Sequence, residues 1–108
     1  MTVDIPTVNW LIPMQIENIR HKALRRFAET GLAKGLPSES VDRLRNMLSY
    51  IDAIAAEEEL FVPPNFGAHK LKGDRKGDWS LTVTPNWRLT FRINEAGAIE
   101  DMDLEDYH

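Results

Sequence analysis

Apolar residues recur at helical spacing in the first half of the chain. Residues 38–57 carry an apolar stripe at i, i+3, i+7, i+10 and i+14, which predicts an amphipathic helix. Residues 20–30 carry a shorter apolar face, and Gly31 follows it where a helix C-terminus accepts a residue with positive φ. The stripe residues are Val41, Leu44, Leu48, Ile51 and Ala55 in the longer segment and Leu24, Phe27 and Ala28 in the shorter one.

The period of the pattern changes to two after a loop. Two prolines and a glycine in residues 61–69 predict this loop. From Asp78 onward, apolar and polar residues alternate on both sides of a tight connection at Pro85, which predicts a β-hairpin with one apolar and one polar face. The apolar face holds Trp79, Leu81, Val83, Trp87, Leu89, Phe91 and Ile93, and the polar face holds Ser80, Thr82, Thr84, Asn86, Arg88, Thr90 and Arg92.

The order of these elements predicts an α+β fold. A last strand, at about residues 98–104, follows the turn sequence NEAG. Two helices followed by strands favour helices packed on the apolar face of a small sheet. The polar face of the hairpin is then expected to lie open to solvent.

Length and composition restrict the class of protein. A chain of 108 residues is long enough for one core and too short for two. No apolar run approaches the roughly 20 residues that a membrane span needs, and the first residues lack the pattern of a signal peptide. The chain has no cysteine, which excludes disulfides, thiolate metal sites and a cysteine nucleophile. We therefore expect a cytoplasmic protein without membrane partners.

The net charge of −4 conceals a strong segregation of charge along the chain. Residues 1–68 hold seven Lys/Arg and nine Asp/Glu, residues 69–92 hold six and two, and residues 93–108 hold none and six, for net charges of −2, +4 and −6. Screening limits exposed charges to a reach of about 8 Å, so the cationic segment can attract an anion such as phosphate although the whole chain is acidic. A solvated face paired with the acidic C-terminal segment is the alternative interpretation.

Candidate chemistry gathers at two places. The sequence HKLKGDRK, residues 69–76, precedes the hairpin whose polar face carries Arg88 and Arg92, and the chain terminates in EDYH, an acid, a phenol and an imidazole in succession. Each feature also has a purely structural interpretation. Arginines on a strand face protect sheet edges or form salt bridges, and a chain terminus is commonly frayed.

The sequence resembles a known family. HKLKGDRKGDWSLTVTPNWRLTF (residues 69–91) and the terminal LEDYH are similar to HigB-type toxins of bacterial type II toxin–antitoxin systems, in the RelE/ParE superfamily, and IRHKALRRFAETG and VDRLRNMLSYIDAI extend the similarity. The resemblance implies the RelE-like microbial RNase fold, in which two N-terminal helices pack on a small, mainly antiparallel curved sheet. It covers residues 16–108 as the toxin domain and leaves residues 1–15 as an N-terminal extension.

The resemblance also implies an activity. Members of the family are mRNA interferases, endoribonucleases that cut messenger RNA on the ribosome by attack of a ribose 2′-hydroxyl on the adjacent phosphodiester, without metal or other cofactor. Carried over position by position, the catalytic residues are His69, Lys72, Arg88, Asp106, Tyr107 and His108. Substrate contacts are expected from Asn86, Lys70, Arg75 and Arg92.

The roles follow from the chemistry of each side chain. Arg88 suits the charge of the phosphorane because a guanidinium is always charged and can meet two phosphate oxygens, and Lys72 adds a point charge. His108 is the candidate general acid because an imidazole titrates near neutrality. Asp106 is either the general base or the group that orients a histidine, and Tyr107 stacks on a base or bonds the phosphate.

The partners implied by the resemblance are a HigA-like helix-turn-helix antitoxin, mRNA, and the ribosome, where the toxin would occupy the A site of the small subunit. Operator DNA would be bound only through the antitoxin complex. Two other functions remain open from the residues: a ParE-like gyrase-inhibiting toxin, and a non-catalytic relic that only binds an antitoxin.

Overall fold

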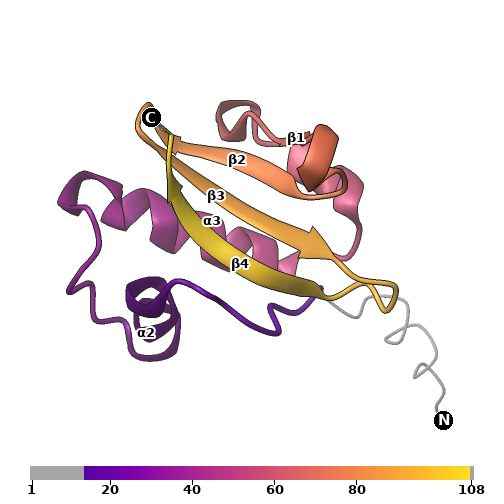
Figure 1. Cartoon of the computed structure of the whole chain (residues 1–108). Coiled ribbons are helices and arrows are strands. Elements are labelled where there is room, and N and C mark those ends of the chain that lie inside the picture. The colour runs from indigo at the N-terminus through magenta and orange to yellow at the C-terminus, as the bar shows by residue number, and fades with distance from the viewer. Residues whose placement is uncertain (1–13, 108) are drawn as a thin grey trace, which may run out of the picture.

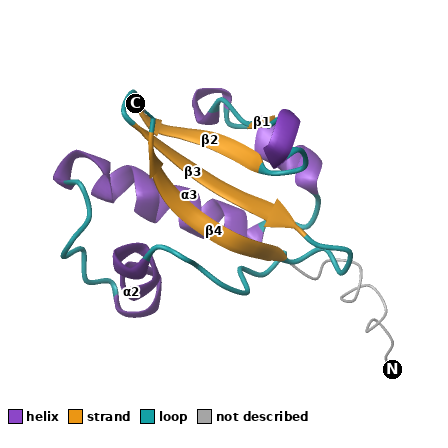
Figure 2. Cartoon of the chain, viewed as in Figure 1, coloured by secondary structure: helices purple, strands orange, loops and turns teal. Residues whose placement is uncertain are grey.

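Two α-helices pack on one face of an antiparallel sheet in the computed structural model, which describes residues 14–107 (Figure 1). The helices are α2 (Lys22–Thr30) and α3 (Val41–Ala53). The strands β1 (His69–Lys70), β2 (Trp79–Thr84), β3 (Trp87–Ile93) and β4 (Ile99–Asp106) lie side by side in chain order. Figure 2 shows the helices and strands as separate layers. The predicted α+β fold is confirmed.

Local signals explain where α2 begins and ends. The His21 side chain precedes the helix, and its Nδ1 accepts a hydrogen bond from the Leu24 amide at 3.1 Å. Gly31 follows the helix with φ of 80°, and its amide donates to the Phe27 carbonyl at 2.8 Å. A residue with a side chain would be strained at this φ, so glycine terminates the helix.

The second helix is shorter than residues 38–57. Residues Ser38–Ser40 form a 3₁₀ turn, and the α-helix ends at Ala53 because Ile54 is extended, with φ of −75° and ψ of 155°. The carboxylate of Glu59 accepts hydrogen bonds from the amides of Ala55 and Ala56 at 2.9 and 3.1 Å, which stabilises the new 3₁₀ helix Glu57–Phe61 instead of a longer α3. The predicted end of this helix was therefore wrong.

The core lies between the helices and the apolar face of the sheet. Its fully buried side chains come from α2, α3 and the three long strands, as the period of the sequence predicts, and Leu60 of the 3₁₀ helix Glu57–Phe61 joins them. Burial of each large apolar side chain contributes about 1.5–3 kcal/mol relative to exposure. The largest of them are Trp79, Phe91, Leu24, Leu44, Met47, Ile51, Leu60, Leu81, Leu89, Ile99 and Met102.

The edges of the sheet differ from the expectation. The edge strand β1 consists of His69, which was the last residue of the predicted loop, and Lys70, which follows it. They pair with Ser80 and Trp79, respectively. At the other edge, β4 continues to Asp106, and a segment that begins at Met14 runs beside it through two parallel bridges, Ile16 with Ile99 and Ile19 with Met102. No helix among residues 14–107 is both long and apolar enough to cross a membrane.

The polar face of the hairpin is partly covered. Ser80 and Thr90 are only 5% and 4% exposed. The connection between β1 and β2, residues 71–78, crosses this face, since its Arg75 reaches Glu105 on β4. The polar face, which we expected to be open to solvent, is therefore partly covered by a cationic loop.

Candidate functional site

The cationic loop comprises residues 71–78 and is a closed, hydrogen-bonded turn. The Leu71 amide donates to the Asp78 carbonyl at 2.8 Å and closes the base of the loop. Inside it lies a 3₁₀ turn, Gly73–Arg75. Backbone hydrogen bonds continue this turn: the Lys76 amide donates to the Gly73 carbonyl at 3.1 Å, and the Asp78 amide donates to the Arg75 carbonyl at 2.9 Å. Lys72 precedes this turn and is exposed. The backbone of the loop therefore has a defined shape.

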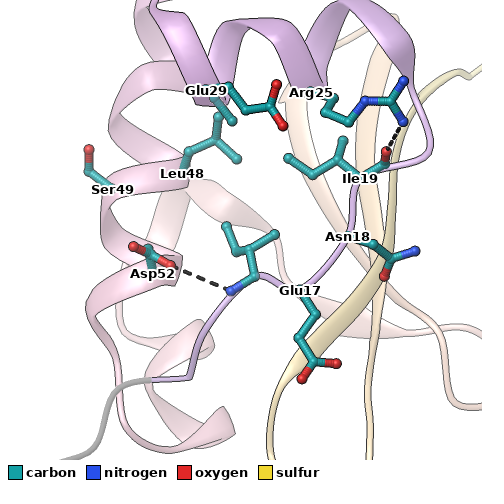
Figure 3. Close-up of a pocket in the computed structure, with 10 residues that line it drawn as sticks. Glu17, Asn18, Ile19, Arg25, Glu29, Leu48, Ser49 and Asp52 are labelled. Atoms are coloured by element: carbon teal, nitrogen blue, oxygen red, sulfur yellow. Dashed lines mark hydrogen bonds between the residues drawn. The ribbon is translucent and has the colours of Figure 1, made fainter.

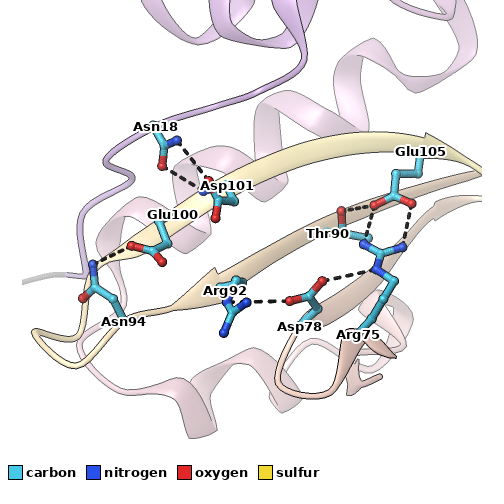
Figure 4. Close-up of polar contacts among 9 residues, drawn as sticks. All are labelled: Asn18, Arg75, Asp78, Thr90, Arg92, Asn94, Glu100, Asp101 and Glu105. Atoms are coloured by element: carbon cyan, nitrogen blue, oxygen red, sulfur yellow. Dashed lines mark hydrogen bonds and ion pairs between the residues drawn. The ribbon is translucent and has the colours of Figure 1, made fainter. Parts of the chain in front are cut away.

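A bidentate ion pair joins the tip of the loop to the last strand (Figure 4). Arg75 donates through Nη1 and Nη2 to the two carboxylate oxygens of Glu105 at 2.8 and 2.6 Å. The buried Thr90 hydroxyl donates to Glu105 Oε2 at 2.5 Å. The hydrogen bonds from Arg75, with a smaller contribution from Thr90, hold the pKa of Glu105 below its ordinary value, and Glu105 raises the pKa of Arg75. Glu105 is therefore ionised and fixed in place.

A second carboxylate extends this network. Asp78 lies 3.2 Å from Arg75 Nε and 3.8 Å from Arg92 Nε, so it lies between the two cations (Figure 4). Lys70 lies 3.6 Å from a Glu57 carboxylate oxygen. Of the four residues predicted to contact substrate, Lys70, Arg75 and Arg92 therefore form ion pairs within the protein, and their contacts with RNA stay a prediction.

Arg88 lies beside the β2–β3 turn, at the end of the hairpin away from Asp78. Its side chain is half-buried rather than open to solvent. Its Nη1 donates to the carbonyls of Thr84, Pro85 and Trp87 at 2.7, 3.2 and 3.2 Å. Its guanidinium carbon lies 3.9 Å from the centroid of the Tyr107 ring. The remaining guanidinium N–H groups point away from these carbonyl contacts by the geometry of the planar fork, which has five N–H donors.

Asp106 and Tyr107 bring the last strand to the same place. The Tyr107 amide donates to the Asn86 carbonyl at 2.7 Å, and Asp106 is paired with Trp87 across β3 and β4. Three predicted site residues, Asn86, Arg88 and Tyr107, thus meet at the β2–β3 turn, and the exposed Asp106 precedes them on β4. His108 lies outside the described residues.

His69 approaches the same face from the other edge of the sheet. Its Nδ1 lies 3.1 Å from the Gly67 carbonyl, and its register partner is Ser80, which in turn faces Thr90. With about 4.8 Å between strands and about 3.4 Å per residue, the Cα atoms of His69 and Arg88 are about 12 Å apart. The structure therefore places an imidazole and a guanidinium on one face, with the cationic loop beside them.

The whole of this face lies in a segment that matches a known family. Residues 17–108 match the model of the RelE-like toxin of type II toxin-antitoxin system HigB. The chain belongs to this family. It is 40% identical over 93 residues to the protein named Endoribonuclease HigB from Proteus vulgaris, an alignment that covers 86% of this chain and 99% of the relative. The predicted family is confirmed.

Two solved structures resemble this HigB-family chain at lower sequence identity. The YoeB/ParE toxin from Agrobacterium tumefaciens is 16% identical, with a TM-score of 0.47, over 79% of this chain and 86% of that one. YafQ from E. coli strain BL21(DE3) is 14% identical, with a TM-score of 0.49, over 84% of this chain and 93% of that one.

A groove on the helical side of this HigB-family chain holds none of the predicted site residues (Figure 3). It has a volume of about 390 Å³ and lies between α2, α3 and residues 16–19. Arg25 Nη1 donates to the Ile19 carbonyl at 3.2 Å there, and Asp52 accepts from the Ile16 amide at 3.5 Å. Residues 14–107 contain no group of three His, Asp or Glu side chains arranged to hold a metal ion.

Sequence reasoning missed the acidic half of the face. Glu105 pairs with Arg75 and accepts a hydrogen bond from Thr90, and Asp78 pairs with both Arg75 and Arg92. None of Glu105, Thr90 and Asp78 was predicted from the sequence as a site residue. Glu105 lies within the quoted LEDYH, and its alternation with the buried Leu104 places it on the polar side of β4. That alternation was the available signal.

Proposed function

We propose that this protein is a toxin that acts as a ribosome-dependent mRNA endonuclease and is neutralised by a HigA-like antitoxin. The observation that carries the proposal is the 40% identity to Endoribonuclease HigB over 99% of that relative's length. The cationic loop and Arg88 support it, because an enzyme that cuts RNA needs fixed cations beside the scissile phosphate. The toxin acts in the cytoplasm, where translating ribosomes are found.

The reaction that this face would support is an intramolecular transesterification, in which the phosphoryl group passes from the 5′-oxygen to the neighbouring 2′-oxygen. The ribose 2′-oxygen forms a bond to phosphorus, the bond from phosphorus to the 5′-oxygen breaks, and the products carry a 2′,3′-cyclic phosphate and a 5′-hydroxyl. A proton leaves the 2′-hydroxyl and another reaches the 5′-oxygen, so the step needs a base, an acid and a cation for the phosphorane. Arg88 is the cation, because a guanidinium is always charged and can meet two phosphate oxygens at once. Lys72 adds a second positive charge.

His69 is the best-supported general base. A carbonyl oxygen can only accept, so the contact with Gly67 assigns the proton of the neutral ring to Nδ1 and leaves Nε2 with a free lone pair. That lone pair can take the proton of a 2′-hydroxyl. His108 is the general acid, Asp106 orients a histidine, and Asn86 positions the substrate. Tyr107 acts through its stacking on Arg88.

Purified protein incubated with translating ribosomes, and separately with DNA gyrase, tests the proposal. We expect cleavage of the ribosome-bound mRNA and full gyrase activity. We expect the antitoxin to be a small helix-turn-helix protein encoded beside this gene, and co-expression of the two tests it: they should form a complex that binds operator DNA. Intact mRNA together with inhibited gyrase would replace the proposal with the ParE-like function, and intact mRNA with active gyrase would favour a relic that only binds an antitoxin.

A further inference from the structure

The loop that carries Lys72 is attached to the sheet at two points of different kind. At its base, the Leu71 amide bonds the Asp78 carbonyl. At its tip, the Arg75 side chain extends past β2 and β3 and forms a bidentate ion pair with Glu105 on β4 (Figure 4). Arg75 ends the 3₁₀ turn that Lys72 precedes, so the two side chains are three residues apart on one short, hydrogen-bonded turn. Movement of the tip therefore moves Lys72.

Glu105 connects this loop to the strand that carries Arg88. It is the register partner of Arg88 across β3 and β4, and such partners have Cα atoms about 4.5–5.5 Å apart. Its carboxylate also accepts a hydrogen bond from the Thr90 hydroxyl of β3 at 2.5 Å. One fixed carboxylate thus sets the distance between the Lys72 loop and the Arg88 strand.

We infer that Glu105 is a positioning residue: its bond to Arg75 holds the Lys72 loop in register with Arg88, so that both cations meet one phosphate. The inference rests on the proposed function, because it concerns the same cleavage reaction. A carboxylate beside a phosphate site repels the substrate. Glu105 therefore weakens RNA binding, while it keeps Lys72 and Arg88 at the positions that cleavage requires. Its removal should therefore separate binding from turnover.

The test is single-turnover cleavage of mRNA on programmed ribosomes by Glu105→Ala, with Glu95→Ala as the matched control. Glu95 lies exposed in the β3–β4 turn, so its substitution removes the same charge without touching the loop. We expect Glu105→Ala to lower the maximal rate by about 10- to 100-fold, since a displacement of about 1 Å in a catalytic group can cost 100-fold. The toxin concentration at half-saturation should stay equal or fall. Glu95→Ala should keep the wild-type maximal rate.

Two further measurements separate positioning from a general loss of fold. Hydrogen–deuterium exchange of free Glu105→Ala should be faster at the amides of Lys76 and Asp78 than in wild type, with the Leu81 and Leu89 amides unchanged. The double variant Arg75→Ala/Glu105→Ala should cut no more slowly than Arg75→Ala, because the two residues act as one unit.

The results distinguish this inference from the proposed function. If the wild type cuts and Glu105→Ala cuts at the same maximal rate, or loses rate only through a higher half-saturation concentration, positioning by Glu105 is overturned and the proposed function stands. If the rate falls but exchange at Lys76 and Asp78 does not change, the inference is also overturned. A wild-type protein that leaves mRNA intact on ribosomes overturns the proposed function, and the inference with it.

Discussion

The guanidinium of Arg88 stacks on the ring of Tyr107, with 3.9 Å between the guanidinium carbon and the ring centroid. The amide of Tyr107 also bonds the carbonyl of Asn86, so the C-terminal segment is attached to the β2–β3 turn by backbone and side chain. A frayed terminus, one interpretation of the sequence EDYH, does not describe Tyr107. The contact makes Tyr107 part of the surface that presents Arg88.

The stacking predicts that the ring of Tyr107 matters more than its hydroxyl. Tyr107→Phe keeps a face for Arg88, and we expect cleavage on ribosomes within about threefold of wild type. Tyr107→Ala removes a contact worth about 0.5–1 kcal/mol at an exposed site, which alone is a factor of about two to five. It also releases Arg88 from its position, so cleavage should fall further, by at least about tenfold. Equal losses in the two variants, measured side by side, would assign the role to the hydroxyl instead.

Arg88 has a structural role as well as the proposed catalytic one. Its Nη1 satisfies carbonyls of the hairpin turn, so Arg88→Ala should lower the free energy of unfolding by about 1–2 kcal/mol. Cleavage should fall by at least about 100-fold, which is more than that stability loss explains for a protein that stays folded at the assay temperature. Urea unfolding and single-turnover cleavage measure the two effects.

The control for that variant is Arg26→Ala, because Arg26 is an exposed arginine of α2 on the helical side of the sheet. It removes the same charge and should change neither quantity by more than experimental error. A comparable loss of cleavage in Arg26→Ala would mean that overall charge, not the site, governs activity.

Glu105 predicts a pH dependence of stability. Its pKa is lowered in the folded protein, chiefly by the hydrogen bonds from Arg75, from an ordinary value of 4.5. A lowered carboxyl pKa means that the unfolded chain binds the proton more readily, so this contribution is present above the unfolded pKa and is lost as pH falls through the folded one. The ion pair is partly exposed, so we expect no more than about 1 kcal/mol.

The measurement is urea unfolding of wild type and Glu105→Gln at pH 7 and at about pH 3. The wild type should be the more stable protein at pH 7, and the difference should shrink at about pH 3. A difference that is the same at both pH values would show that the charge of Glu105 contributes nothing.

The last residue is predicted to supply the general acid. His108→Gln and deletion of His108 should each lower cleavage by about 100- to 10,000-fold, the usual effect of losing general acid catalysis. Thermal unfolding of both variants should match wild type. Wild-type rates in both would remove His108 from the mechanism.

Much of the fold follows from local patterns. The apolar stripe through Leu44, Leu48 and Ile51 predicts α3, and strict alternation predicts β2 and β3, because burial of one face is a property of spacing alone. The end of α3 was missed because a side chain five residues beyond Ile54, Glu59, bonds the amides that would have continued the helix.

The site was harder to predict than the fold. Arg75 and Glu105 are 30 residues apart, and their contact depends on Arg75 reaching past β2 and β3 and on the register of β4. Composition indicated a cationic segment and an acidic one, but their pairing is a tertiary contact. A resemblance in motifs supplied the candidate residues, and only the structure shows which of them are already engaged with carboxylates or backbone carbonyls.

The most direct test of the account is the chemistry of the RNA ends left on translating ribosomes. Wild-type protein is expected to leave 2′,3′-cyclic phosphate on the upstream fragment and 5′-hydroxyl on the downstream one, and Arg88→Ala is expected to leave the message intact. Fragments with 5′-phosphate ends, or a message cut equally by Arg88→Ala, would contradict the proposed reaction and the role of Arg88 in it.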